Sequence, residues 1–127
     1  MRNEPATPVA VTLPATAGAS AQARRIVGEA GAAWGVSADV AEDAALVVTE
    51  LVSNAVDHAT GPLELTVSRS GTGMRIEVAD QSTTLPQPRP VEVDSARGRG
   101  LIIINALSRS WGTTPTANGK VVWAELG

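Results

Sequence analysis

The sequence predicts an α+β fold, a two-layer α/β sandwich in which helices pack on one face of a mixed, mainly antiparallel sheet. Its 127 residues suit a single domain with one hydrophobic core. Apolar residues alternate in some segments and recur with helical spacing in others, in the order strand, helix, helix, hairpin, long connection, helix, strand. This order separates the helices from the sheet, as a two-layer sandwich requires.

The first elements follow a short tail. Residues 1–8 are expected to be flexible, and residues 9–127 to form the domain. A strand is predicted over residues 9–13, where apolar residues alternate with small or polar ones. Residues 20–34 then have helical spacing, with Ser20 as the expected N-cap.

A second, longer helix and a hairpin come next. The helix is expected to begin at Ser37 and to end before Gly61 and Pro62, because both residues break helices. Apolar residues alternate on either side of the turn sequence SGTG, which predicts an antiparallel hairpin over residues 63–79. One face of this hairpin is expected to be buried.

The last part of the chain contains a long connection. Residues 80–99 have three prolines and no periodicity, and connections of that length are typical of functional lids or disordered segments. Helical spacing returns in residues 101–111. An Asn-Gly turn at 118–119 then precedes a closing strand over residues 120–126.

Composition limits the classes of function. The chain has no cysteine and one histidine, which argues against disulfides and against a multi-histidine zinc site. A net charge of −3 and the absence of Phe and Tyr argue against a nucleic-acid partner. There is no long apolar run that could span a membrane, and the first ten residues lack the apolar region of a secretory signal. We therefore expect a cytoplasmic protein with no membrane partner.

Polar residues interrupt the otherwise apolar stretch ELVSNAVDHA, residues 50–59. On a helical wheel Glu50, Asn54 and Asp57 lie opposite the apolar arc, and His58 falls at its edge. A solvated helix face is the ordinary explanation. The functional alternative is a cleft into which Glu50 and Asn54 point together. There the amide oxygen of Asn54 would ligate Mg²⁺, and Glu50 would orient or deprotonate a hydroxyl group.

Two glycines, Gly98 and Gly100, stand where the long connection meets the last helix. Helix N-termini offer free N–H groups, and glycines let the backbone approach a phosphate closely. Glycines also occur in loops before helices that bind no phosphate, so the pattern alone does not decide between the two explanations. The sequence contains neither the P-loop pattern nor a G-x-G-x-x-G after a strand, which argues against those two kinds of nucleotide site.

Asp80 stands at the end of the second hairpin strand. A carboxylate there either caps the following loop or accepts a hydrogen bond from the exocyclic amine of adenine, a donor that guanine lacks at that position. Lys120, the only lysine, follows the final turn and is expected to be solvated.

In order and spacing, these motifs resemble the N box, G1 box, lid and G2 box of the Bergerat ATP-binding fold, which is found in DNA gyrase and histidine kinases. Within that family the chain resembles the small stand-alone ATP-binding proteins of the anti-sigma-factor serine/threonine kinase group. The resemblance covers residues 9–127, including the ending GKVVWAEL.

The resemblance implies roles for individual residues. Glu50 would be the catalytic base or water-orienting residue, Asn54 the Mg²⁺ ligand between the phosphates, and Asp80 the adenine-recognising residue. An arginine of the first helix, Arg24 or Arg25, would approach the transferred phosphate, although a solvated helix face explains both equally well. The remaining residues expected to contact ATP, water or Mg²⁺ are Asp57, Ser82, Arg97, Gly98, Arg99, Gly100 and Leu101.

The chain departs from the family at the G1 box. The family pattern is D-x-G, whereas here Asp80 and Gln81 are followed by Ser82. The Cβ of a serine narrows the space beside the adenine ring, where the family has a glycine. Its hydroxyl group, on the other hand, is able to contact the purine or a water.

Three functions follow from the resemblance. The first is an anti-sigma regulatory protein that binds ATP and Mg²⁺, phosphorylates an antagonist protein on Ser or Thr, and sequesters a sigma factor. The second is a partner-binding switch protein without catalysis, in which the G1 box is degenerate. The third, a fragment of a sensor histidine kinase, is disfavoured because His58 lies within the nucleotide-site helix. Relatives often dimerise, so a homodimer remains an open alternative.

Overall fold

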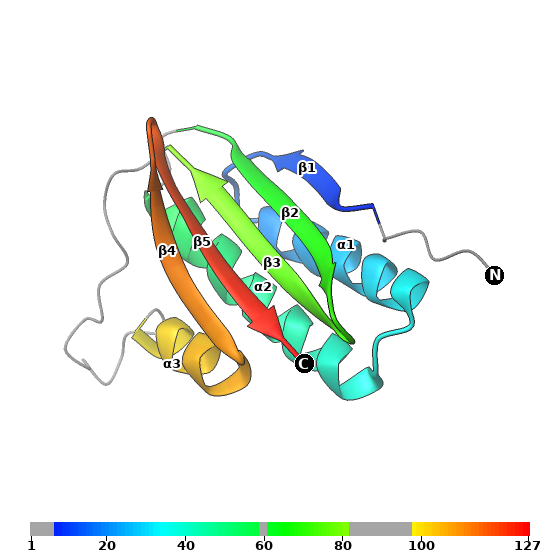
Figure 1. Ribbon diagram of the computed structural model, residues 1–127. Helices are drawn as coiled ribbons and strands as arrows, with labels where there is room; N and C mark the ends of the chain where they lie inside the picture. The colour runs from blue at the N-terminus through cyan, green and yellow to red at the C-terminus, as the bar shows by residue number, and fades with distance from the viewer. Residues whose placement is uncertain (1–6, 59–60, 82–97) are drawn as a thin grey trace.

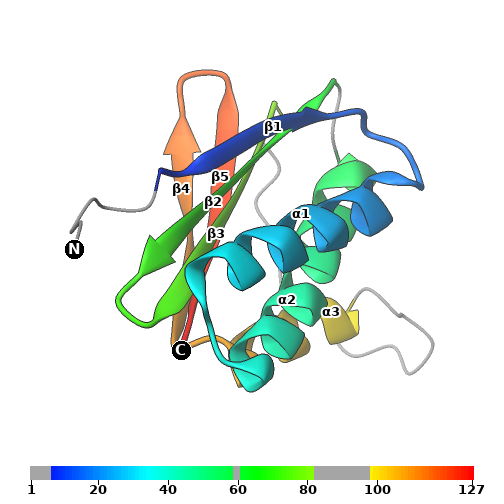
Figure 2. The same ribbon diagram turned by 90° about the vertical axis from the view of Figure 1, so that its right-hand side faces the viewer.

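Two layers, a sheet and a set of helices on one of its faces, make up the part of the chain that the computed structural model describes, residues 7–58, 61–81 and 98–127 (Figures 1 and 2). The strands are β1 (Val9–Leu13), β2 (Leu63–Ser70), β3 (Gly73–Asp80), β4 (Ser110–Thr116) and β5 (Gly119–Leu126). The helices are α1 (Ala19–Trp34), α2 (Ala38–His58) and α3 (Gly98–Leu107). The predicted α+β sandwich is confirmed.

The sheet has the strand order β1-β2-β3-β5-β4, and every pair of neighbours is antiparallel. The sheet is thus antiparallel throughout these strands, not mixed. Because β3 lies at its centre, the last residue of β3 meets the start of β5, and Asp80 stands directly opposite Lys120. This register decides the surroundings of the candidate site.

Alternating residues of the central strands form the sheet side of the core. The apolar residues at alternate positions of β2, β3 and β5 are buried against α2, whose own apolar arc is also buried. The buried residues of α2 are Ala44, Val47, Val48, Leu51, Val52 and Ala55. The opposite face of the sheet carries charged groups, among them Arg75, which lies 4.4 Å from the ring centroid of Trp123 and donates to Glu77 and Glu125. The helical wheel of α2 therefore identified the buried side correctly.

The helix starts were predicted with mixed success. Ser37 precedes α2 as expected, and its Oγ accepts a hydrogen bond from the backbone N–H of Val40 at 3.2 Å. The assignment of Ser20 as an N-cap was wrong, because α1 begins at Ala19 with Gly18 at the cap position. Ser20 lies inside the first turn, and its hydroxyl group is bonded across to α2.

The segment after the long connection differs most from the prediction. The helix expected over residues 101–111 begins earlier, at Gly98, and ends at Leu107, after which β4 forms from Ser110. β4 was not predicted, because its sequence SWGTTPT lacks alternation and contains a proline. Asp80 belongs to β3 and not to the connection. The prediction for the rest of the connection falls on residues 82–97, which lie outside the described residues.

Gly119 permits the close approach of β5 to the end of β3. A Cβ at this position would collide with the backbone carbonyl oxygen of Asp80, whereas a Cβ at Gly28, on the exposed side of α1, would meet open space. We expect Gly119→Ala to lower the free energy of unfolding by about 1–3 kcal/mol, because neither strand can move without breaking the register. Gly28→Ala should raise it by about 0.5–1 kcal/mol. Urea unfolding measures both, and equal effects of the two alanines would contradict this view of the strand contact.

Candidate functional site

Helix α2 carries Glu50 and Asn54 one turn apart on the side opposite its buried arc. Both side chains are half-buried, whereas Asp57, one turn further on, is exposed. The helix packs on α1, α3 and β3, so Glu50 and Asn54 belong to a helix that has neighbours on several sides. A fully solvated face, the ordinary explanation for this pattern, does not describe Glu50 and Asn54.

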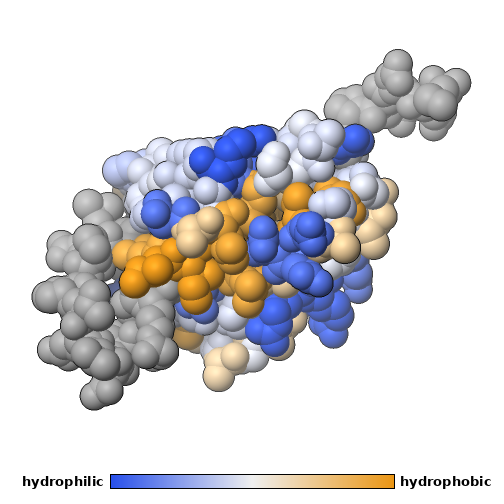
Figure 3. Space-filling view, turned by 90° about the horizontal axis from the view of Figure 1, so that it is seen from below, coloured by the Kyte–Doolittle hydropathy of each residue, from blue (hydrophilic) through white to orange (hydrophobic). Residues whose placement is uncertain are grey.

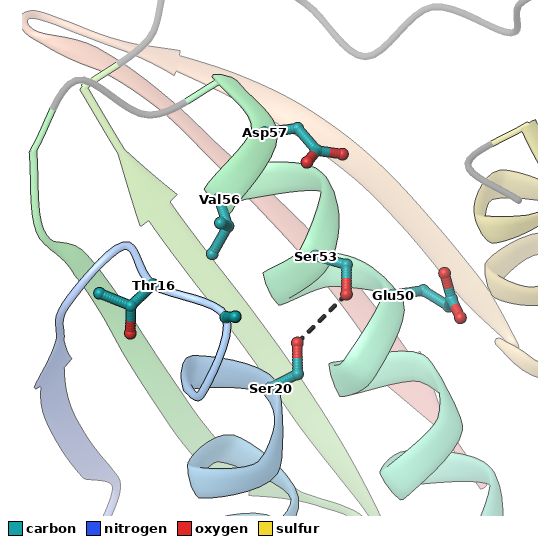
Figure 4. Close-up of a pocket in the computed structure, with 7 residues that line it drawn as sticks. Thr16, Ser20, Glu50, Ser53, Val56 and Asp57 are labelled. Atoms are coloured by element: carbon teal, nitrogen blue, oxygen red, sulfur yellow. Dashed lines mark hydrogen bonds between the residues drawn. The ribbon is translucent and has the colours of Figure 1, made fainter.

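A cavity of about 400 Å³ opens beside Glu50 (Figure 4). Its wall is built from the segment before α1, from the first turn of α1 and from α2. The lining residues are Thr16, Ala17, Ser20, Glu50, Ser53, Val56 and Asp57. In Figure 4 the carboxylates of Glu50 and Asp57 project from the same flank of α2. The cavity therefore combines acidic groups with several hydroxyl groups.

The hydroxyl groups of Ser20 and Ser53 join the two helices at this cavity. Their Oγ atoms lie 3.1 Å apart, within hydrogen-bond distance (Figure 4). Sequence reasoning missed this pair, since a contact between residues so far apart in the chain leaves no local pattern. The sequence offered only a serine near the predicted start of α1, which was assigned as the N-cap.

Burial raises the pKa of Glu50 above its ordinary value. Partial removal from water disfavours the ionised carboxylate, since the protein replaces only part of its hydration. A carboxylate whose pKa is shifted toward neutrality takes up a proton more readily, as a general base must. Among the residues predicted for the site, Glu50 thus has the electrostatics that its expected role requires.

Arg24 lies close to this helix. Its guanidinium donates a hydrogen bond to Oγ1 of Thr49 at 3.3 Å, and Thr49 immediately precedes Glu50. The Thr49 hydroxyl in turn donates to the carbonyl oxygen of Ala45 at 2.7 Å. Both arginines considered for the site are exposed, and Arg24 is the one whose hydrogen bond reaches α2.

Asp80 and Lys120 form a buried ion pair. The Lys120 Nζ atom donates to Asp80 Oδ1 at 3.2 Å and lies 3.1 Å from Oδ2. The two side chains are 4% and 0% exposed, for Lys120 and Asp80 respectively. The expectation of a solvated Lys120 was therefore wrong. Lys120 is buried because the antiparallel register sets it directly across from the buried carboxylate of Asp80.

The two glycines Gly98 and Gly100 occupy the first turn of α3, as expected for a helix N-terminus that could bind phosphate. Leu101, which follows them, packs against the core. The side chain of Arg99 is not described, and Ser82 and Arg97 lie outside the described residues. Their contacts with ATP remain predictions.

Comparison with known proteins decides the family. The sequence model of the histidine kinase-like ATPase domain matches residues 13–126. The chain belongs to this family. As an ATPase-type domain it carries a nucleotide site, which agrees with the Bergerat-type domain predicted from the motifs. A search of curated protein sequences gave no significant match.

A solved structure has the same fold as this histidine kinase-like ATPase domain. It contains the RsbU and RsbW domains of Rv1364c from Mycobacterium tuberculosis, with a TM-score of 0.73 and 24% sequence identity. The match covers 96% of this chain and 32% of the solved chain, so this domain spans about a third of the length of that protein. None of the helices in the described ranges is long and apolar enough to cross a membrane.

The residues of this ATPase domain suit ATP with Mg²⁺. Within the described residues, no group of three or more His, Cys, Asp or Glu side chains could hold a metal ion by itself. Mg²⁺ is typically bound by one or two protein oxygens while phosphates and waters complete its shell, and Asn54 offers one such oxygen. Helix α2 contacts both α3, which begins with the glycines, and β3, which ends in Asp80. The fold therefore gathers the elements that carry the predicted nucleotide residues.

Proposed function

We propose that the chain is an anti-sigma regulatory protein that binds ATP with Mg²⁺ and acts as a serine/threonine kinase on an antagonist protein. Membership of the histidine kinase-like ATPase family and the structural similarity to a chain that contains an RsbW domain support this proposal. The observation that carries it is Glu50, a carboxylate with a raised pKa at the wall of a polar cavity, one turn from Asn54.

The nucleotide assignment gives each element one task. Asn54 would hold Mg²⁺ together with the phosphates. Asp80 would accept a hydrogen bond from the exocyclic amine of adenine. The N-terminus of α3, with Gly98 and Gly100, would bind the phosphates through backbone N–H groups. Mg²⁺ would supply charge neutralisation at the phosphates, as it does generally in phosphoryl transfer.

The cavity beside Glu50 is the proposed place of the acceptor serine or threonine. Glu50 would hold the acceptor hydroxyl and take up its proton, which is how a carboxylate contributes to a reaction dominated by positioning. Ser20, Ser53 and Thr16 supply hydrogen-bonding groups for the backbone on either side of the acceptor. Arg24, held against Thr49, lies close enough to α2 to contact the same partner.

The experiment is a phosphotransfer assay with the purified chain, Mg²⁺-ATP and candidate antagonist proteins of the source organism. Mass spectrometry should find phosphate on a serine or threonine of one antagonist. If the chain binds ATP and phosphorylates none of them, the kinase assignment is wrong and the binding role remains.

A second candidate function is a partner-binding module in which ATP is only a structural ligand. One observation favours it. Two large apolar side chains are exposed, Leu46 of α2 by 53% and Ile102 of α3 by 57%. Figure 3 shows hydrophobic surface gathered on the side seen from below in Figure 1. Exposed apolar surface of this kind often marks a protein partner, here a sigma factor or its antagonist. Tight ATP binding without phosphotransfer would support this candidate.

A further inference from the structure

We infer that the acceptor serine or threonine lies in an extended, basic segment of the partner, in which an apolar residue two positions away packs on Leu46. The inference rests on the proposed function, because it takes Glu50 as the base that holds the acceptor hydroxyl group. It adds the class of sequence that this site accepts, and it gives a role to an exposed residue outside the cavity wall.

Leu46 lies on the same side of α2 as Glu50. Four residues separate the two, which places Leu46 about 6 Å nearer the start of the helix and about 40° around its axis. The side chain of Leu46 is 53% exposed, whereas the next two residues, Val47 and Val48, are buried. Single exposed apolar residues are common on protein surfaces, so exposure alone carries no function. The informative feature is that this one lies one turn from the proposed base.

The spacing of Leu46 and Glu50 matches an extended chain. In such a chain side chains alternate between two faces, so residues two positions apart share a face and are separated by about 6.5–7 Å. This separation is close to the rise of about 6 Å between the two residues of α2. The cavity of about 400 Å³ beside Glu50 would take the acceptor side chain. The residue two positions away would then lie over Leu46.

Acidic residues continue along α2 from Leu46 toward the start of the helix. Asp39 and Glu42 are exposed, and Asp43 is half-buried. In the ion pairs found among the described residues, every carboxylate belongs to β3 or β5 and none to α2. The helix dipole favours acids in the first turn only, and that turn contains Asp39 alone. Charge complementarity therefore favours a partner segment with Lys or Arg beyond its apolar residue.

Two other occupants fit this side of α2 less well. A second copy of the chain, docked through the same face about a two-fold axis, would bring like charges together. A helical partner segment would set its apolar residue four positions from the acceptor, because residues four apart share a face of a helix. The position of the preferred apolar residue therefore separates an extended segment from a helical one.

The experiment uses synthetic peptides with one central serine, phosphorylated by the full chain with Mg²⁺-ATP. The peptides differ in the position of a single leucine, placed two or four residues before or after the serine, with alanine as the reference. We expect leucine at one of the two positions two residues away to raise kcat/KM at least about fivefold over alanine. Replacing lysines beyond this leucine with glutamates should lower kcat/KM, and added salt should reduce that difference.

Two variants of the chain test whether Leu46 makes the contact. Leu46→Ser should bring the leucine-to-alanine ratio of kcat/KM close to one. The matched control is Ile102→Ser, which removes a similarly exposed aliphatic side chain, 57% exposed, from α3 and should keep the ratio of the wild type. Because both peptides are compared within one protein, a change in ATP binding or in the amount of folded chain cancels from the ratio.

The remaining outcomes also decide between the alternatives. Preference for leucine four positions away, no preference at all, or an unchanged ratio in Leu46→Ser would each overturn the inference and leave the kinase proposal intact. If the chain phosphorylates an antagonist protein but none of the peptides, it does not recognise a linear segment, and the inference alone fails. If it phosphorylates neither, the kinase proposal and the inference fail together.

Discussion

Replacing Glu50 with glutamine is expected to slow ATP hydrolysis by the purified chain about 10²–10⁴-fold, the usual contribution of a general base. The dissociation constant of ATP should change by less than about threefold, because Glu50 is assigned to the attacking hydroxyl group and not to the nucleotide. Glutamine has nearly the same shape as glutamate but cannot take up the proton. ADP release measures the rate, with water as the acceptor.

Glu42→Gln is the matched control for this prediction. Glu42 lies on the same helix and its side chain is exposed. Its amide variant makes the same change of charge on α2 but lies outside the cavity wall. If Glu42→Gln and Glu50→Gln slow hydrolysis equally, the role of Glu50 is only that of a charge on the helix.

The raised pKa of Glu50 also predicts the pH dependence. A base must be ionised, so hydrolysis should fall with decreasing pH through the pKa of Glu50, at a higher pH than for an ordinary glutamate. The contribution of Glu50 to the stability of the fold changes with pH in the opposite direction. The native chain binds this proton more tightly than the unfolded chain, so the contribution of Glu50 to stability is present at acidic pH and is lost as the pH rises. At neutral pH, Glu50→Gln should therefore be at least as stable as the wild type.

Replacing Asp80 with alanine should have the largest effect on stability, a loss of about 3–5 kcal/mol in the free energy of unfolding. The substitution leaves the ammonium group of Lys120 buried and without its carboxylate, since only 4% of that side chain is exposed. The energy of a buried pair is small, but the cost of removing one partner is large. Urea unfolding at neutral pH provides the measurement.

The double variant Asp80→Ala with Lys120→Met tests the cause of this loss. It removes both charges, so we expect it to recover most of the stability. If the double variant is as unstable as Asp80→Ala alone, the loss arises from the missing Asp80 side chain and not from an unpaired lysine.

Periodicity was sufficient to predict much of the fold. The hairpin of β2 and β3 was predicted within about one residue of its observed bounds, and the long helix α2 within one residue of its observed start, since each has a strong apolar pattern on one face. β4 has no such pattern. Its backbone is held by pairing with β5, although Gly112 and Pro115 are poor strand residues, so tertiary context decides its conformation.

The residues of the site were only partly predictable, because tertiary contacts also decide which of them meet. Glu50 and Asn54 share a helix, so their spacing indicated a common face. The bond between Ser20 and Ser53 and the pair of Asp80 with Lys120 join distant segments, which no local pattern reveals. Strand parity did contain a signal for Lys120, because counting back by two from Val122 places the lysine on the buried face of β5.

The most direct test of the proposed site is calorimetric titration with ATP, with and without Mg²⁺, of the wild type, Asn54→Ala and the control Gln22→Ala. Gln22 is a half-buried amide residue on α1, so its variant removes the same chemical group at a comparable position. We expect Asn54→Ala to weaken ATP binding in Mg²⁺ about 10–100-fold and to abolish the effect of the metal, while Gln22→Ala behaves as the wild type. Equal, Mg²⁺-dependent affinity in all three proteins would contradict the assignment of Asn54 to the metal, and with it the proposed place of the metal and phosphates beside α2.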